Sequence, residues 1–352
     1  METKIAFAHP MGMHKNLKTS GSRAERILAS PQWQNGKFRN PSGAREMVAL
    51  GETKGVASEF LFGGKKRRPP HAFPTHDPRP SLQQPPETGF RVTWLGHSTL
   101  LVEMDGVRFL TDPVWAQRAS PVGFVGPSRW QQVPLDIASV PDLDFVLLSH
   151  DHYDHLDAGA VTALAKRGFT FLVTLGVGKH LDRWGIPSEQ YVELDWWDSV
   201  ELKGVKVTST PTQHFSGRGV LDRNSTLWGS FVVEGDTHRF YFGADSGFGD
   251  HYQSIAREFG RFDLVTLEIG AFHPSWAGIH MGPENAWRAY DALGGGHFLP
   301  IHWGTFDLAV HPWDEPPEQI LALAGDRPLM LPQIGSPTEP ARWEQNVPWW
   351  RP

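Results

Sequence analysis

The sequence contains no cysteine among its 352 residues. Disulfide bonds and thiolate metal sites are therefore excluded, and any bound metal must be held by histidine and carboxylate side chains. The sequence also contains no apolar run approaching the roughly 20 residues that cross a membrane. Residues 1–10 lack the charged-then-apolar layout of a secretory signal, so we expect a cytoplasmic protein.

An excess of positive charge is also missing, because the net charge is −6 and the isoelectric point is about 6.3. We therefore expect no nucleic-acid partner. Hydrophobic residues make up 39% of the chain, which is ample for one large or two small domains with a real core. The 15 tryptophans are expected mostly in that core, with an apolar substrate or lipid-facing surface as the alternative.

Histidine, in contrast, is concentrated in one short motif within residues 149–157, directly after an apolar run that predicts a buried strand. His150 and His152 are two positions apart, so an extended backbone directs both imidazoles to the same side. Asp154 and His155 follow in a turn that can direct a second pair toward a second point. Two such donor sets suit two adjacent divalent metals, with zinc favoured and manganese or iron as alternatives.

The rest of the chain divides at about residue 88. Residues 1–88 are rich in proline and basic residues and predict an arm that packs on the main domain, with one helix at 42–50. Residues 89–352 predict the catalytic domain. Its expected strands are 90–95, 98–104, 107–111, 145–148, 169–175, 190–194, 205–210, 227–234, 238–243, 262–269, 298–301 and 329–331. Its expected helices are 157–167, 177–184, 283–293 and 317–324. This order favours two packed sheets with helices outside, an α/β layered sandwich.

Polar donors also stand where other predicted strands end, and strand ends at one edge of a sandwich converge on a shared cleft. The expected metal ligands are His150, His152 and His214 for the first metal, Asp154, His155 and His302 for the second, and Asp245 between them. Asp112 and Asp151 are expected to orient ligand imidazoles. The role of His97 is left open.

Four motifs carry a family resemblance: WLGH at 94–97, LTDP at 110–113, the histidine motif at 149–157 and IHWGTF at 301–306. They resemble the phospholipases D that hydrolyse N-acyl-phosphatidylethanolamines, and their bacterial relatives, within the metallo-β-lactamase superfamily. The resemblance covers about residues 90 to 310. It implies a four-layer αββα sandwich with a dinuclear metal site.

The resemblance also implies a further histidine near the reacting phosphodiester, and the matching position is His280. Ile279 precedes it, where the family member has a polar amide, so the head-group contact that the resemblance implies is open to question at this position. The expected catalytic residues are therefore Asp245, Asp154 and His280. His280 as a satisfied structural histidine is the alternative.

The favoured function is cleavage of N-acyl-phosphatidylethanolamine to N-acylethanolamine and phosphatidic acid, with a metal-bridging hydroxide attacking phosphorus. The lipid would approach over the tryptophan-containing loop at 115–130 and the N-terminal arm, with peripheral membrane contact. A soluble lactonase, esterase or other phosphodiesterase using the same site is the alternative, and a di-iron redox protein is a further one. The substrate, the native metal and the oligomeric state stay open, with a homodimer among the options.

Overall fold

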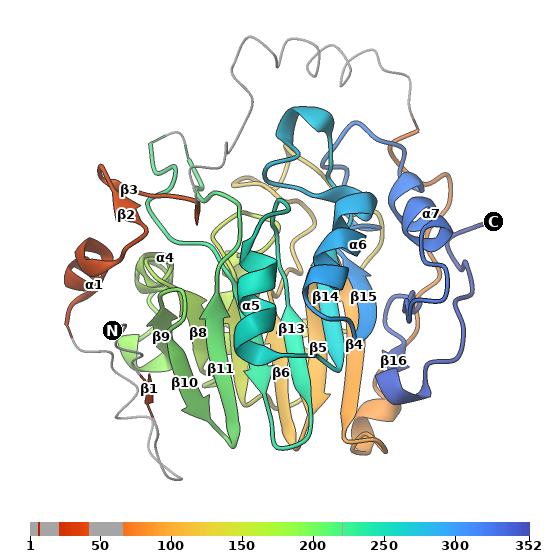
Figure 1. The fold of residues 1–352 in the computed structure, drawn as a ribbon, viewed down its shortest axis with the longest axis horizontal. Coiled ribbons are helices and arrows are strands. Elements are labelled where there is room, and N and C mark those ends of the chain that lie inside the picture. The colour runs from red at the N-terminus through yellow and green to blue at the C-terminus, as the bar shows by residue number, and fades with distance from the viewer. Residues whose placement is uncertain (1–5, 8–20, 42–65, 220) are drawn as a thin grey trace.

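Two seven-stranded sheets face each other in the computed structural model, which describes residues 6–7, 21–41, 66–219 and 221–352 (Figure 1). The strand order of the first sheet is β1 (Ala6–Phe7), β10 (Ser199–Leu202), β11 (Val205–Thr210), β12 (Ser230–Glu234), β13 (Arg239–Phe242), β14 (Leu264–Glu268) and β15 (His297–Ile301). The order of the second is β16 (Pro337–Thr338), β4 (Phe90–Gly96), β5 (Thr99–Met104), β6 (Val107–Thr111), β7 (Phe145–Leu148), β8 (Phe171–Thr174) and β9 (Tyr191–Leu194).

Helices cover the outer faces of both sheets (Figure 1). The helices are α3 (Ala158–Ala165) and α4 (Gly178–Arg183) beside the second sheet, and α5 (His251–Phe259), α6 (Gly282–Ala292) and α7 (Glu315–Ala322) beside the first. The α/β sandwich predicted from the order of elements is therefore confirmed. Helix α1 (Arg23–Ala29) and a small hairpin of β2 (Trp33–Gln34) and β3 (Lys37–Phe38) lie between β1 and β4 in the chain.

Strand β7 shows why an uninterrupted apolar run is required before the histidine motif. Phe145 and Leu147 belong to the core between the sheets. Val146 and Leu148 belong to the core under the helices, together with Val161 of α3. Because successive side chains of a strand point to opposite faces, a strand buried on both faces must be apolar throughout. The motif that follows is therefore anchored at its start by a strand that cannot shift without exposing core side chains.

The sequence analysis did not predict the two-residue strands β1, β2, β3 and β16. It also did not predict three longer elements, each of which carries a signal. Helix α1 begins with a capping box in which Ser22 and Glu25 bond reciprocally. Strand β10 forms a hairpin with β11 across Lys203 and Gly204, both with positive φ. Helix α5 ends at Gly260, with a φ of 71°, after apolar residues at helical spacing.

The strand predicted at 329–331 is wrong. Only Leu329 forms a bridge there, with Phe298, and Met330 donates one hydrogen bond to the Phe298 carbonyl. Pro328 and Pro332 flank this segment, and proline cannot donate to a sheet ladder. The helix predicted at 42–50 lies outside the described residues.

The described parts of residues 1–88 contact the rest of the chain at several points. Arg23 of α1 forms an ion pair with Glu193 at 2.8 Å, at the end of the second sheet. Phe38 is fully buried in a cluster with Trp196 and Trp228. The division of the chain into an arm at residues 1–88 and a catalytic domain at 89–352 remains a prediction.

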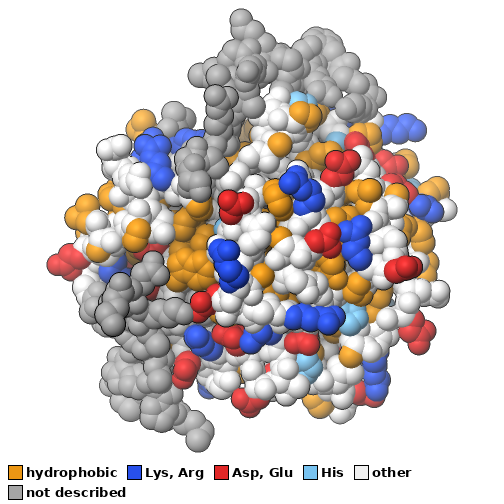
Figure 2. Space-filling view, in the orientation of Figure 1, with side chains coloured by type: hydrophobic (Ala, Val, Ile, Leu, Met, Phe, Trp, Pro, Cys, Tyr) orange, Lys and Arg blue, Asp and Glu red, His pale blue; other side chains and the backbone are white. Residues whose placement is uncertain are grey.

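The described surface mixes charges of both signs. On the face shown in Figure 2, basic and acidic side chains are interspersed over the helices. Within the residues that the structure describes, no helix is both long and apolar enough to cross a membrane.

Candidate metal centre

The predicted ligands lie at one edge of the sandwich, where strands from both sheets end. The histidine motif follows β7, which runs parallel to β6 and β8. In the first sheet His214 follows β11, Asp245 follows β13 and His302 follows β15. Strand ends at one edge place side chains from distant parts of the chain into a common site. All seven predicted ligands are brought together there.

The first group consists of His150, His152 and His214, whose ring nitrogens lie close enough to share one ion. His150 Nε2 lies 2.9 Å from His152 Nδ1, and His214 Nε2 lies 3.2 Å from the same atom. Nitrogen ligands of a tetrahedral zinc ion are separated by about 3.3 Å when the bonds are about 2.05 Å long. The three imidazoles are thus close to the arrangement that such an ion requires.

The second group consists of Asp154, His155 and His302, joined by His97. Asp154 Oδ2 lies 3.4 Å from His302 Nε2 and 3.6 Å from His155 Nε2. The sequence left His97 open, and the structure places its Nε2 only 3.0 Å from Asp154 Oδ2. His97 therefore either orients Asp154 or adds a donor to this group.

Asp245 lies between the two groups. Its Oδ2 atom is 3.2 Å from the Nε2 atoms of His155 and His302, and 3.7 Å and 3.9 Å from those of His214 and His150. One carboxylate thus faces imidazoles of both groups, as the predicted bridging position requires. Its role as a metal ligand remains a prediction.

Three observations test whether metals fit these residues. Buried polar atoms without a hydrogen-bond partner gather here, among them Asp245 Oδ1, His155 Nε2 and His302 Nε2. Such atoms are costly unless a ligand or ion satisfies them. Positive φ angles also gather at the site, at His97 (52°), Asp112 (33°), Ala244 (49°) and His302 (63°). Imidazole and carboxylate donors suit zinc, manganese and iron, so the site fits divalent metals.

Burial and neighbouring charges set the protonation of the metal-free cluster. Burial and the adjacent imidazoles lower the pKa of His150 well below its usual value, and burial does the same for His214. Burial would raise the pKa of Asp245, but His155 and His302 outweigh it and hold that pKa well below its usual range. Neutral imidazoles and an ionised carboxylate are the forms that bind metal ions. Burial would lower the pKa of His155 and of His302, but the carboxylate of Asp245 outweighs it and raises the pKa of His155 well above its usual value and that of His302 to about 10, so these two rings must release protons when a metal binds.

Asp112 contacts a predicted ligand imidazole as expected, whereas Asp151 does not. Asp112 Oδ2 accepts from His155 Nδ1 at 2.7 Å, which leaves Nε2 of that ring directed at Asp245. Asp151 does not take the expected role, because its carboxylate bonds to His180, Thr226 and the Gly217 backbone. In an extended backbone, the side chain of residue 151 points away from those of residues 150 and 152. Asp151 therefore contacts residues outside the predicted ligand set.

A buried glutamate that the sequence reading missed completes the site. Glu268 is the last residue of β14 and is fully buried. Its Oε2 atom lies 2.5 Å from Nδ1 of His280, and its Oε1 atom accepts from the Ser246 backbone at 3.0 Å. Burial raises the pKa of Glu268, and the facing His280 opposes that effect. The signal in the sequence was a single acidic residue closing an otherwise apolar strand.

His280 itself stands next to both metal groups. Its ring centroid lies 5.2 Å from that of His214 and 5.2 Å from that of His302. Ile279, the residue expected to have lost a head-group contact, is buried and offers its carbonyl oxygen to His214 Nδ1 at 3.1 Å. The backbone at this position therefore supports a predicted ligand.

Comparison with known proteins decides the family. Residues 107–303, more than half of the chain, match the model described as the Beta-lactamase superfamily domain. The chain belongs to this superfamily. It is a metal-dependent hydrolase with the metallo-β-lactamase fold, as the sequence motifs predicted.

Two curated relatives and one solved structure illustrate the similarity. The uncharacterised protein Rv0906 of Mycobacterium tuberculosis is 42% identical, covering 96% of this chain and 93% of its own length. The N-acyl-phosphatidylethanolamine-hydrolyzing phospholipase D 1 of Caenorhabditis elegans is 40% identical over 64% of this chain and 66% of that protein. Igni18, a metallo hydrolase from Ignicoccus hospitalis, has a TM-score of 0.54 at 22% identity, covering 71% of this chain and 97% of that chain. This last similarity shows the fold alone.

Metal binding is expected to stabilise this superfamily member, because the ion satisfies buried donors only in the folded state. A single site held at 100 times its dissociation constant contributes about 2.7 kcal/mol of stability. In a chain of this size we expect Tm to rise by roughly 5 °C. Differential scanning calorimetry of chelator-treated protein, with and without added zinc, measures the shift. The same shift in a His150→Ala/His302→Ala double variant would contradict the assignment of these ligands.

Proposed function

We propose that this metal-dependent hydrolase is a phospholipase D-type phosphodiesterase that cleaves N-acyl-phosphatidylethanolamine to N-acylethanolamine and phosphatidic acid. The observation that carries the reaction type is His280, held by buried Glu268 beside the metal groups. A phosphodiester hydrolase must protonate an alkoxide leaving group, and a fixed imidazole can do so. The similarity to the Caenorhabditis elegans enzyme supports the substrate class.

The chain's residues divide the work of this reaction. His150, His152 and His214 would hold one metal, Asp154, His155 and His302 the other, and Asp245 would face both. Bound divalent metals supply a water nucleophile at neutral pH and polarise a phosphoryl oxygen. We propose zinc because histidine-rich oxygen and nitrogen donor sets are common for it, and metal analysis of the purified protein tests this.

The two ring nitrogens of His280 have different roles in the proposed reaction. Nδ1 is engaged by Glu268, which leaves Nε2 to give a proton to the departing oxygen of the N-acylethanolamine. As the bond from phosphorus to that oxygen breaks, a new bond forms between phosphorus and the water oxygen. The products are then an alcohol and a phosphate monoester, as hydrolysis of the diester requires.

The loop between β6 and β7 supports approach from a lipid surface. Its tip exposes Phe124 by 79% and Val125 by 56%. Its base is held beside the metal centre, because the Trp130 backbone donates to the Thr305 carbonyl at 2.9 Å, three residues after His302. Exposed apolar side chains next to an active site are typical of surfaces that contact membranes or partners. We propose that this tip makes peripheral contact with the bilayer.

Replacing Phe124 with Asp is expected to weaken binding to phospholipid vesicles about tenfold or more. A buried Phe side chain contributes roughly 1.5–3 kcal/mol, and 1.4 kcal/mol corresponds to a factor of ten. The value of KM for vesicle substrate should rise while kcat stays near that of the unaltered protein. Co-sedimentation with vesicles and initial rates measure both quantities.

Val347→Asp is the matched control, because Val347 is 61% exposed and lies outside both the 115–130 loop and residues 1–88. It should leave vesicle binding unchanged. Equal effects of both variants would show that the Phe124 tip has no special part in membrane contact.

A paired assay tests the proposed substrate. N-acyl-phosphatidylethanolamine in mixed micelles is compared with a panel of soluble lactones and phosphodiesters, using one preparation of known metal content. Release of N-acylethanolamine and phosphatidic acid, lost on chelation, is the expected result. Turnover of soluble substrates alone would leave the superfamily assignment intact and refute the phospholipase proposal.

A further inference from the structure

Asn40 forms a reciprocal pair of hydrogen bonds with the backbone of His214. Its Nδ2 donates to the His214 carbonyl at 2.8 Å, and its Oδ1 accepts from the His214 N–H at 2.9 Å. Asn40 is 174 positions away in the chain and is only 8% exposed. A side-chain amide here takes the place that a neighbouring strand would have in a sheet.

His214 needs such a partner because it lies beyond the end of β11, where no sheet neighbour pairs with its backbone. The preceding residue, Gln213, is tied elsewhere, with its carbonyl accepting from Gly247 at 2.8 Å. The backbone N–H of His214 donates to Asn40 Oδ1, and the His214 carbonyl accepts from Asn40 Nδ2. A buried backbone group without a hydrogen-bond partner is costly in free energy, so these two bonds restrict the position of the His214 backbone.

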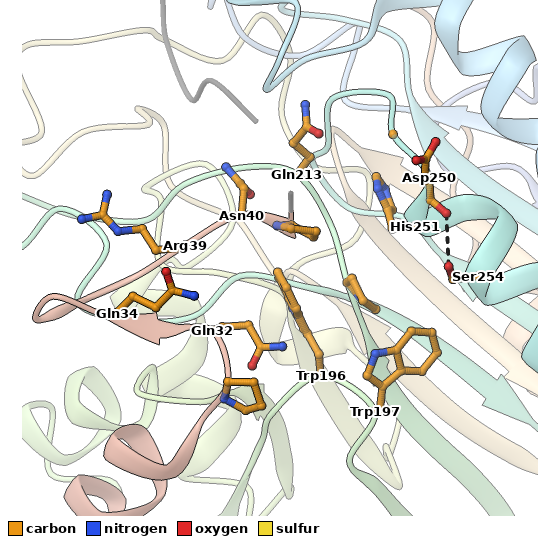
Figure 3. Close-up of a pocket in the computed structure, with 14 residues that line it drawn as sticks. Gln32, Gln34, Arg39, Asn40, Trp196, Trp197, Gln213, Asp250, His251 and Ser254 are labelled. Atoms are coloured by element: carbon orange, nitrogen blue, oxygen red, sulfur yellow. Dashed lines mark hydrogen bonds between the residues drawn. The ribbon is translucent and has the colours of Figure 1, made fainter. Parts of the chain in front are cut away.

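A cavity adjoins Asn40 and the residue before His214. Asn40 and Gln213 line a cavity of about 510 Å³, together with Trp196 and Trp197. Figure 3 shows Asn40 and Gln213 close together at one end of this cavity. His214 itself is fully buried, so on the side of the cavity the hydrogen bonds with Asn40 add to the packing of its ring.

Asn40 is itself held firmly from the other direction. Its Oδ1 also accepts from Trp228 Nε1 at 3.0 Å. Two residues earlier, the Phe38 backbone N–H donates to the Asn224 carbonyl at 2.9 Å. The amide of Asn40 is therefore a fixed point to which the His214 loop can be attached.

We propose that Asn40 is a positioning residue for the first metal group. It fixes the backbone of His214, while the Ile279 carbonyl fixes the ring through Nδ1, so that Nε2 faces His152 and Asp245. A segment outside the residues that match the superfamily model thus sets the position of a predicted ligand. This inference rests on the metal assignment made above and not on the lipid substrate.

Titration of the metal-free, full-length protein with Co²⁺ tests the proposal, with the visible absorption of bound cobalt as the signal. The unaltered protein is expected to bind two equivalents. Asn40→Ala should retain one equivalent and bind the other about 10–100-fold more weakly, the range seen when groups that orient a ligand are removed. Excess metal should restore its activity, because affinity and not the chemistry is impaired.

Phe38→Leu is the matched control for a general weakening of the N-terminal segment. It removes packing two residues from Asn40 but leaves the bonds to His214 in place, so both equivalents should bind as in the unaltered protein. Unchanged cobalt affinity in Asn40→Ala would overturn the proposal. So would an equal loss in Phe38→Leu when both variants have the same Tm.

His214→Ala separates failure of this inference from failure of the metal assignment. Loss of one equivalent in His214→Ala, with unchanged affinity in Asn40→Ala, would refute the positioning role alone. If His214→Ala still binds both equivalents, His214 is not a ligand, and the assignment falls together with the inference. Neither result depends on which substrate the enzyme hydrolyses.

Discussion

Asp245→Ala is expected to lower kcat by about 10³-fold or more while the fold stays intact. Asp245 faces imidazoles of both groups, so under the proposed ligand assignment its loss would disturb both metals at once. Metal ions contribute several kcal/mol to stabilising charge in the transition state, and each 1.36 kcal/mol corresponds to a factor of ten. Steady-state kinetics with any turned-over substrate, together with metal content and circular dichroism, measure the effect.

Two further variants make the Asp245 experiment specific. Asp245→Asn preserves the shape of the side chain and should lose nearly as much activity, because an amide is a poor substitute for an anionic ligand. Asp291→Ala removes an exposed aspartate whose carboxylate lies 3.3 Å from Arg327, and it should leave kcat unchanged. Full activity in Asp245→Ala would rule out a dinuclear mechanism.

Glu268→Gln is expected to produce the second-largest loss, about 10²-fold in kcat with N-acyl-phosphatidylethanolamine. Without the carboxylate, Nδ1 of His280 loses its partner, which in the proposed reaction keeps Nε2 directed toward the leaving group. General acid catalysis typically contributes about 10²–10⁴-fold. A diester with a nitrophenol leaving group needs no proton at departure, so its turnover should change little. The ratio of the two rates is the measurement.

The ratio also separates a catalytic role from a structural one. Glu103→Gln is the matched control, because Glu103 is another buried glutamate on a strand and pairs with Arg91 at 2.6 Å. It should lower stability without changing the ratio of the two rates. His280→Ala should reproduce the Glu268→Gln pattern, and the double variant should add little, since the two residues act as one unit. Equal losses on both substrates would contradict the proton-donor role.

Local sequence patterns predicted most of the sandwich because its strands are distinct apolar runs. The run 145–148 was read correctly as a buried strand, and β7 occupies the same residues. Helix α5 was missed even though Tyr252 and Ile255 have helical spacing. The segment 329–331 was misread, because apolar composition indicates burial but not whether neighbouring prolines allow a ladder.

The amino-acid sequence by itself determined the chemistry available to this protein. The absence of cysteine and the motif around His150 leave imidazoles and carboxylates as the metal donors. The motif also placed four of these donors within six positions, where local backbone geometry alone brings them close. The donors of the histidine motif were therefore within reach of sequence reasoning.

The distant groups that support the predicted ligands became apparent from the fold. Glu268 and His280 are 12 positions apart, and Asn40 and His214 are 174 apart. Such contacts depend on how strands from two sheets end at a common edge and on which loops pass there. The predicted strand ends indicated that His214, Asp245 and His302 would converge. They did not indicate which supporting groups lie beside these ligands, because that is set by packing between segments.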